Sequence, residues 1–115
     1  MMQKIFAIAS KMYRAIRPVR SPHYLAWVRS FPCIACGTQK KLRDAAHVGP
    51  HGMGQKACDL STVPACRSCH QQLHRMGRLK FEMLHGIDLF LAIDQLQDSY
   101  TKRFGRLPGE EERAA

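Results

Sequence analysis

The stretch Cys66-Arg67-Ser68-Cys69-His70-Gln71-Gln72-Leu73-His74 decides the fold of this chain. Its two cysteines lie three positions apart, the spacing of one half of a tetrahedral zinc site. If the stretch continues as a helix, His70 and His74 lie one turn apart on one face, where they can bind a second metal ion. The stretch therefore predicts ligands for two metals, one structural and one catalytic.

A second pair of cysteines precedes this stretch. Cys33 and Cys36 have the same spacing, and twenty-nine residues separate Cys36 from Cys66. Gly37 follows the pair and permits the positive φ of a tight metal-binding turn. Four thiolates at this spacing can surround zinc and leave no open coordination position. We therefore expect Cys33, Cys36, Cys66 and Cys69 to bind one structural Zn²⁺; the alternative is four buried, reduced cysteines.

The segments around the cysteines predict a small α+β domain. Ser21 is a suitable cap for a short helix, and Pro32 ends it. A short strand should end at His47, and a second should lead into Cys66. Helical periodicity returns in the last third of the chain, with Gly86 as a candidate break. The expected helices cover residues 22–31, 68–77 and 81–104, and the expected strands cover 40–48 and 62–65.

The chain length allows one small domain, since 115 residues are too few for two substantial cores. We expect a basic N-terminal arm over residues 1–20, the domain itself over 21–104 and a flexible acidic tail over 105–115. The opening residues make a poor signal peptide, because their apolar patch is short. No apolar run reaches the length of a membrane span. These features predict a cytoplasmic protein with reduced cysteines and no membrane contact.

Positive charge is concentrated where the candidate metal ligands lie. Residues 1–80 hold fourteen Lys and Arg against two acids, which gives +12, whereas residues 81–115 hold four against seven, which gives −3. A basic surface attracts polyanions, so DNA is the expected partner, and a merely solubilising basic face is the alternative. The residues expected to contact the phosphate backbone are Lys56, Arg67, Arg14, Arg17 and Arg20.

Two groups of residues carry a resemblance to a known family. The segment Asp44-Ala45-Ala46-His47, followed by residues 62–70 and His74, resembles the HNH endonucleases, which have the ββα-metal fold. The loop of residues 52–56, followed by Asp59-Leu60, is similar to that of phage Ref-type recombination-enhancement nucleases and related small prophage proteins. The resemblance covers roughly residues 21–96.

This resemblance implies roles for three histidines. His47 would be the general base, and His70 and His74 would bind a catalytic Mg²⁺, Mn²⁺ or Zn²⁺ ion. His51 is a rival base, because its glycine-rich loop can carry it to a phosphate. The implied activity is hydrolysis of DNA phosphodiester bonds, which leaves 5′-phosphate and 3′-hydroxyl ends. The Ref-type likeness further implies a recombinase filament as a partner.

The chain departs from the HNH pattern at two positions. Ala46 stands where many members have a metal ligand before the base, and Ser61 stands where the family has asparagine. Asp59 is the natural substitute as a ligand or as an orienting residue, because hard cations prefer carboxylates. Asp44 is a second candidate, which strand alternation is expected to turn away. The departures leave a second function open: a catalytically degenerate, zinc-stabilised nucleic-acid-binding accessory protein.

Overall fold

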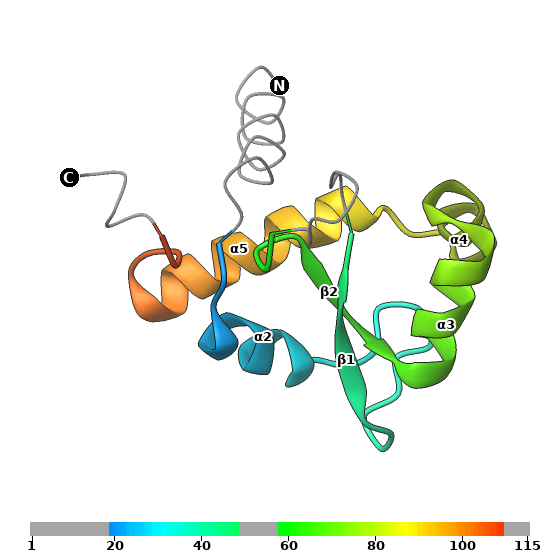
Figure 1. Ribbon diagram of the computed structural model, residues 1–115, viewed down its shortest axis with the longest axis horizontal. Coiled ribbons are helices and arrows are strands. Elements are labelled where there is room, and N and C mark those ends of the chain that lie inside the picture. Colours follow the sequence, from blue (N-terminus) through cyan, green and yellow to red (C-terminus); the bar gives the residue numbers. More distant parts are fainter. Residues whose placement is uncertain (1–18, 49–57, 110–115) are drawn as a thin grey trace.

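The computed structural model describes residues 19–48 and 58–109, which form a small α+β fold around a two-stranded hairpin (Figure 1). The expected helices and strands are confirmed, with bounds that differ by a few residues. In chain order the elements are α2 (Pro22–Arg29), β1 (Arg43–His47), β2 (Thr62–Cys66), α3 (Arg67–Met76), α4 (Arg78–His85) and α5 (Leu89–Phe104).

The hairpin fixes the relative positions of the candidate site residues. β1 and β2 pair antiparallel, with Arg43 opposite Cys66 at one end and His47 opposite Thr62 at the other. All five residues of β2 are buried. A strand that is buried on both faces lies between two packed layers. The cysteines of the opening stretch are therefore at one end of the hairpin, and the candidate base is at the other.

Two hydrophobic clusters cover the hairpin. The first joins strand residues such as Ala46 and Val63 to Leu73 of α3, Phe81 of α4 and Ile93 of α5. The second consists of Tyr24, Val28, Cys58, Leu60, Tyr100 and Leu107 and joins α2 to the last part of α5. The long helix α5 contributes to both clusters, so it connects the two halves of the core.

Helix α2 begins as the sequence predicts. The Ser21 hydroxyl accepts a hydrogen bond from the backbone N–H of Tyr24 at 3.1 Å, and Pro22 occupies the first turn. A serine cap and a proline at the helix start both satisfy or remove backbone donors that lack partners there. This start holds the chain before α2 in a defined path beside the hairpin.

The C-terminal helical region is divided at Gly86, as expected. Gly86 has a φ of 65° and ends α4, and Asp88 then caps α5 by accepting from the backbone N–H of Leu91 at 3.0 Å. Left-handed backbone of this kind favours glycine. α5 has 16 residues. No helix among the described residues combines the length and apolar character that crossing a membrane requires.

The described ends of the chain pack against the domain. The backbone N–H of Asp59 donates to the carbonyl of Val19 at 3.0 Å, so the chain is already tied down before residue 21. Leu107 is buried in the second cluster. Val19 and Leu107 therefore pack against the folded body. Residues 110–115, in the acidic tail, lie outside the described residues.

Candidate metal and catalytic centres

The loop with the first cysteine pair lies along β2. The backbone N–H of Ile34 donates to the carbonyl of Pro64 at 2.8 Å, which places the loop beside the strand that ends at Cys66. Within the loop, Gly37 has the expected positive φ of 73° and its N–H donates to the Cys33 carbonyl at 2.9 Å. These contacts bring two cysteine pairs that are distant in sequence to one place.

A single arginine holds the rest of this loop. The Nε of Arg43 donates to the carbonyl of Phe31 at 3.0 Å, and one of its terminal nitrogens donates to the carbonyls of Gln39 and Lys41 at 2.7 and 2.9 Å. A guanidinium carries five donors in a fixed plane, which suits several carbonyls at once. Arg43 therefore closes the segment between α2 and β1 around the cysteines.

The four cysteines form a cluster that can hold a metal ion such as zinc. The sulfurs of Cys33, Cys36, Cys66 and Cys69 all lie within 4.8 Å of one another. Cys36 Sγ and Cys66 Sγ are 3.8 Å apart. Zinc–sulfur bonds of about 2.3 Å at tetrahedral angles place two sulfurs about 3.8 Å apart. Cys36 is exposed, whereas the other three cysteines are buried.

Two thiols of the cluster have pKa values shifted in opposite directions. Burial alone would raise the pKa of Cys33, but backbone N–H groups of Cys36, Cys66 and Ala35 lower it to about 6. Burial, followed by hydrogen bonds with Cys66 and Cys33, raises the pKa of Cys69. Amide donors that stabilise a thiolate are the surroundings a metal-binding cysteine requires.

His47 is paired with a buried carboxylate at the far end of the hairpin. Its Nε2 lies 2.9 Å from Oδ1 of Asp59, whose side chain is 6% exposed. An ionised carboxylate only accepts hydrogen bonds, so Nε2 carries the proton. The other ring nitrogen, Nδ1, is then the one that can accept a proton. An imidazole fixed in this way can act as a general base.

Asp59 is held by backbone and charge contacts from before α2. Its Oδ2 accepts from the backbone N–H of Ser21 at 2.8 Å, and a terminal nitrogen of Arg20 lies 3.5 Å from Oδ1. The Thr62 hydroxyl donates to the Asp59 carbonyl at 2.8 Å and closes the turn that leads into β2. The carboxylate therefore has a fixed position from which it orients the imidazole of His47.

His70 and His74 face each other on α3. Their Nε2 atoms are 3.1 Å apart, and Nδ1 of His70 lies 3.0 Å from Oδ2 of Asp44. Nδ1 donates to the carboxylate, which turns the Nε2 lone pair of His70 toward His74. Two nitrogens bound to one ion at about 2.1 Å each are roughly 3.0–3.4 Å apart. The pair has the spacing of two ligands of one metal ion.

Asp44 links this pair to an exposed arginine. Arg67 Nε donates to Oδ2 of Asp44 at 3.0 Å, and the Arg67 side chain is 73% exposed. Hydrogen bonds from Arg67, and then from His70, hold the pKa of Asp44 below its usual value. Strand alternation explains the position of Asp44, because Asp44 and Ala46 share the face of β1 that packs toward α3. The expectation that alternation turns Asp44 away was wrong.

Asp59 does not lie beside the histidine pair. Among the described residues, the four cysteines are the one group of three or more candidate ligands whose atoms lie within 4.8 Å of one another. The role of Asp59 as a ligand beside His70 and His74 therefore does not fit the geometry, because the turn before β2 directs its carboxylate to His47. Ala46 is 0% exposed in the first hydrophobic cluster, which explains an apolar residue there.

Several candidate residues fall in segments that the structure does not describe. His51 and Lys56 lie within residues 49–57, and Arg14 and Arg17 lie within residues 1–18. Their expected roles in proton transfer and in binding the phosphate backbone stay predictions. Arg20 is described, and it lies against Asp59 rather than in a separate arm.

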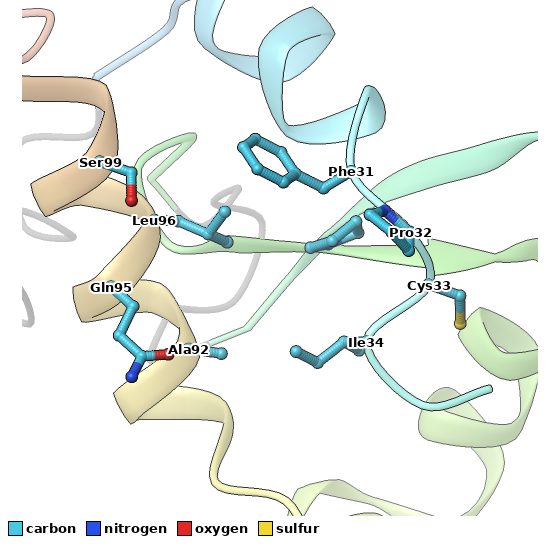
Figure 2. A pocket seen from close by; sticks show the side chains of 9 residues that line it. Phe31, Pro32, Cys33, Ile34, Ala92, Gln95, Leu96 and Ser99 are labelled. Carbon is cyan, nitrogen blue, oxygen red and sulfur yellow. The ribbon is translucent and has the colours of Figure 1, made fainter. Parts of the chain in front are cut away.

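A cavity of about 350 Å³ lies between α5 and the cysteine loop (Figure 2). Figure 2 shows Phe31, Ile34 and Leu96 around the space, with Gln95 and Ser99 on the α5 side. Its lining includes Cys33 of the cysteine cluster but no histidine, carboxylate, lysine or arginine, so the cavity is separate from both histidine sites. The lining consists of Phe31, Pro32, Cys33, Ile34, Pro64, Ala92, Gln95, Leu96 and Ser99.

Comparison with known proteins identifies the family of the chain. Over 71 residues the chain is 39% identical to "Uncharacterized protein YdfU" of Escherichia coli (strain K12), a match that covers 59% of this chain and 20% of that protein. The chain thus matches about a fifth of the length of its curated relative. No solved structure matches the chain. The family model described as "Protein of unknown function (DUF968)" matches residues 10–102, so the chain belongs to the DUF968 family.

Proposed function

We propose that this protein is a metal-dependent DNA endonuclease of the HNH type. The observation that carries the proposal is the pairing of His47 with the buried carboxylate of Asp59 at 2.9 Å, at the end of a ββα unit. A histidine with this partner is held in one tautomer, as general bases in hydrolytic enzymes are. His47 belongs to the basic part of the chain, residues 1–80, whose net charge of +12 suits a polyanionic substrate.

In this proposal His47 activates the water that attacks phosphorus. Nδ1 takes the proton from water while Nε2 keeps its hydrogen bond to Asp59. The hydroxide attacks phosphorus in line with the departing 3′-oxygen, the P–O bond to that oxygen breaks, and the leaving oxygen takes a proton from water. The carboxylate orients the imidazole and balances the positive charge that the ring gains. By resemblance to HNH enzymes, the products carry 5′-phosphate and 3′-hydroxyl ends.

His70 and His74 would bind the catalytic divalent ion. Their facing Nε2 atoms and the Asp44 carboxylate behind His70 support this role, since metal-binding histidines commonly donate their other N–H to a carboxylate. When bound there, Mg²⁺, Mn²⁺ or Zn²⁺ supplies stabilisation of the negative charge that develops on the phosphate oxygens. Imidazole and carboxylate donors accept all three ions.

The four cysteines would bind a structural Zn²⁺. The cluster contains no donor other than thiolates, so a zinc ion in it has no open coordination position for a substrate. Cys66 is the residue immediately before α3, so the zinc would fix the start of the helix that carries His70 and His74. Arg67, beside the same helix start, would contact the DNA backbone.

A specific observation favours a second function, that of a degenerate DNA-binding accessory protein. Ala46 is buried, and no third ligand joins His70 and His74 among the described residues. Water or a residue outside the described part of the chain would have to complete the metal shell of an active enzyme. In the accessory protein the zinc site and the basic surface are kept, and the nuclease chemistry is lost.

A plasmid-nicking assay separates the two functions. Supercoiled plasmid is incubated with Mg²⁺ or Mn²⁺ and the wild type, His47→Ala or His23→Gln, where His23 is an exposed histidine on α2 and serves as the matched control. We expect nicking by the wild type and by His23→Gln, and a loss of about 100-fold or more in His47→Ala. DNA binding by all three proteins without any nicking would reject the nuclease and favour the accessory function.

A further inference from the structure

The guanidinium of Arg20 lies beside the His47–Asp59 pair. One terminal nitrogen of Arg20 lies 3.5 Å from Oδ1 of Asp59, the oxygen that also accepts from Nε2 of His47 at 2.9 Å. Both groups contact one oxygen, so the guanidinium and the imidazole lie at the same end of the Asp59 carboxylate. The Arg20 side chain is 44% exposed, so a phosphate can reach it from solvent.

The backbone on both sides of Arg20 fixes the position of the guanidinium. The carbonyl of Val19 accepts from the N–H of Asp59 at 3.0 Å, and the N–H of Ser21 donates to Oδ2 of Asp59 at 2.8 Å. Arg20 therefore lies between two residues that are tied to the Asp59 turn. A side chain mounted in this way has less conformational freedom to lose on binding a ligand than one on a loose arm.

The spacing fits a phosphodiester and its attacking water. The two contacts to Oδ1 keep the Arg20 nitrogen no more than about 6.4 Å from Nε2 of His47. Nδ1, the proposed proton acceptor, is the other nitrogen of the same five-membered ring, and reacting atoms in a productive complex lie about 3–3.5 Å apart. A guanidinium that holds a phosphate oxygen would thus leave room for one water between phosphorus and imidazole. Arginine also matches the planar spread of phosphate oxygens.

Other arginines near the centres are less suited to this role. All three carbonyl contacts of Arg43 lie within the cysteine loop, and Arg67 pairs with Asp44 beside the histidine pair. Arg29 is exposed at the last position of α2, seven residues beyond the helix start that Ser21 fixes. The guanidinium of Arg20, in contrast, lies against Asp59.

We infer that Arg20 binds the scissile phosphodiester and places it beside His47. This inference rests on the proposed nuclease function and names the residue that presents the substrate to its base. Arg20 exchanges its contact with Asp59 for one with a phosphate oxygen, and Asp59 keeps its hydrogen bonds to Ser21 and His47. In the reaction the guanidinium stabilises the charge that accumulates on the phosphate oxygens as the hydroxide attacks.

The first test compares cleavage by Arg20→Ala, Arg20→Lys and the matched control Arg29→Ala. We expect Arg20→Ala to lower kcat by about 100-fold, the usual effect of removing one donor to the transition state, while Arg29→Ala changes only the strength of DNA binding. Arg20→Lys keeps the charge but loses the fork of donors, so its kcat should lie between those of the wild type and Arg20→Ala. If Arg20→Ala and Arg29→Ala both raised KM to the same extent and left kcat unchanged, the inference would be overturned.

The second test does not depend on cleavage. NMR spectra of protein with isotope-labelled histidine are recorded as a short single-stranded DNA oligonucleotide is added, without divalent ions. We expect the ring signals of His47 to shift in the wild type and in Arg29→Ala but not in Arg20→Ala. Unchanged His47 signals in free Arg20→Ala would show that its pairing with Asp59 is intact. If the wild type shows the shift but never nicks plasmid, the nuclease proposal fails and phosphate binding by Arg20 stands; shifts that persist in Arg20→Ala reject the inference.

Discussion

The Nε2 atoms of His70 and His74 face each other at 3.1 Å across one turn of α3. Nδ1 of His70 donates to Asp44, so its Nε2 has a lone pair directed at His74. His74 either donates an Nε2–H proton to this lone pair or shares a metal ion with it. The pair is therefore suited to bind a cation, and this suitability can be tested apart from the cysteine cluster.

The double variant His70→Ala plus His74→Ala should lose one metal ion and keep another. The cysteines retain zinc, whereas the second ion has no remaining imidazole ligand. Metal content after equilibration with Mn²⁺ or Co²⁺, measured by atomic emission, gives the stoichiometry. Gln71→Ala, an exposed change on the same helix, is the control. Identical metal content in all proteins would reject the histidine site.

Asp44→Asn should weaken metal binding at His70 without removing a ligand. The amide no longer offers a charged acceptor to Nδ1, and comparable losses behind metal ligands lower metal affinity by about 10–100-fold. Isothermal titration calorimetry with Mn²⁺ measures the change. Asp98→Asn, an exposed change on α5, should leave the affinity unaltered. An affinity in Asp44→Asn equal to that of the wild type contradicts an orienting role for Asp44.

Cys66→Ser should abolish both zinc binding and cooperative unfolding. Cys66 belongs to the sulfur cluster and directly precedes α3, so its loss removes a ligand and frees the helix start. Structural zinc contributes on the order of 10 kcal/mol to folding in small domains. Zinc content and thermal melts followed by circular dichroism test this. Cys58→Ala, a buried cysteine outside the cluster, should keep its zinc; a zinc-free, fully stable Cys66→Ser would contradict the prediction.

Asp59→Asn should strongly reduce the rate of nicking and have a much smaller effect on the free energy of unfolding. The asparagine amide can donate to the imidazole and hold it in the wrong tautomer, so we expect a loss of about 100-fold or more in cleavage. Asp59→Ala leaves the Ser21 N–H without its acceptor and should also cost about 1–3 kcal/mol of unfolding free energy. Urea unfolding and the nicking assay measure both effects. Nicking by Asp59→Asn at the wild-type rate would exclude the orienting role.

The stability of the domain should fall at alkaline pH through Tyr100. Burial raises the pKa of Tyr100 above 10, so the folded state holds this proton more tightly than the unfolded state. Its stabilising contribution is complete below pH 10 and is lost as the pH rises from there through the folded-state pKa. Tyr100→Phe should show a smaller alkaline fall in melting temperature, although it loses the 2.8 Å hydrogen bond to His23. Parallel melting curves against pH for both proteins would disprove the coupling.

The elements of the fold could be predicted because their signals are local. The Ser21 cap, the cysteine spacing, Gly37 and Gly86 each act within a few residues, and the structure has them as expected. The same holds for the one-turn spacing of His70 and His74. In each case the backbone geometry follows from the residue and its immediate neighbours.

The partners of the two aspartates could not be predicted with the same certainty. The contact of Asp59 with the Ser21 N–H joins residues 38 positions apart, and that of Asp44 with His70 joins residues 26 apart. Such pairs depend on how α2 and α3 pack on the hairpin, which periodicity does not specify. Asp44 offered one usable signal: it shares the side of β1 with apolar Ala46, and that side had to face a covering helix.

The hydrogen bonds of Arg43 affect how readily the loop with the first cysteine pair would bind the proposed zinc ion. These three hydrogen bonds, to the carbonyls of Phe31, Gln39 and Lys41, come from the protein alone and need no metal. The loop can therefore take its shape before the ion arrives, and less ordering remains to oppose metal uptake. We expect a variant without this guanidinium to take up zinc more slowly and to retain it less well, although every sulfur ligand is still present.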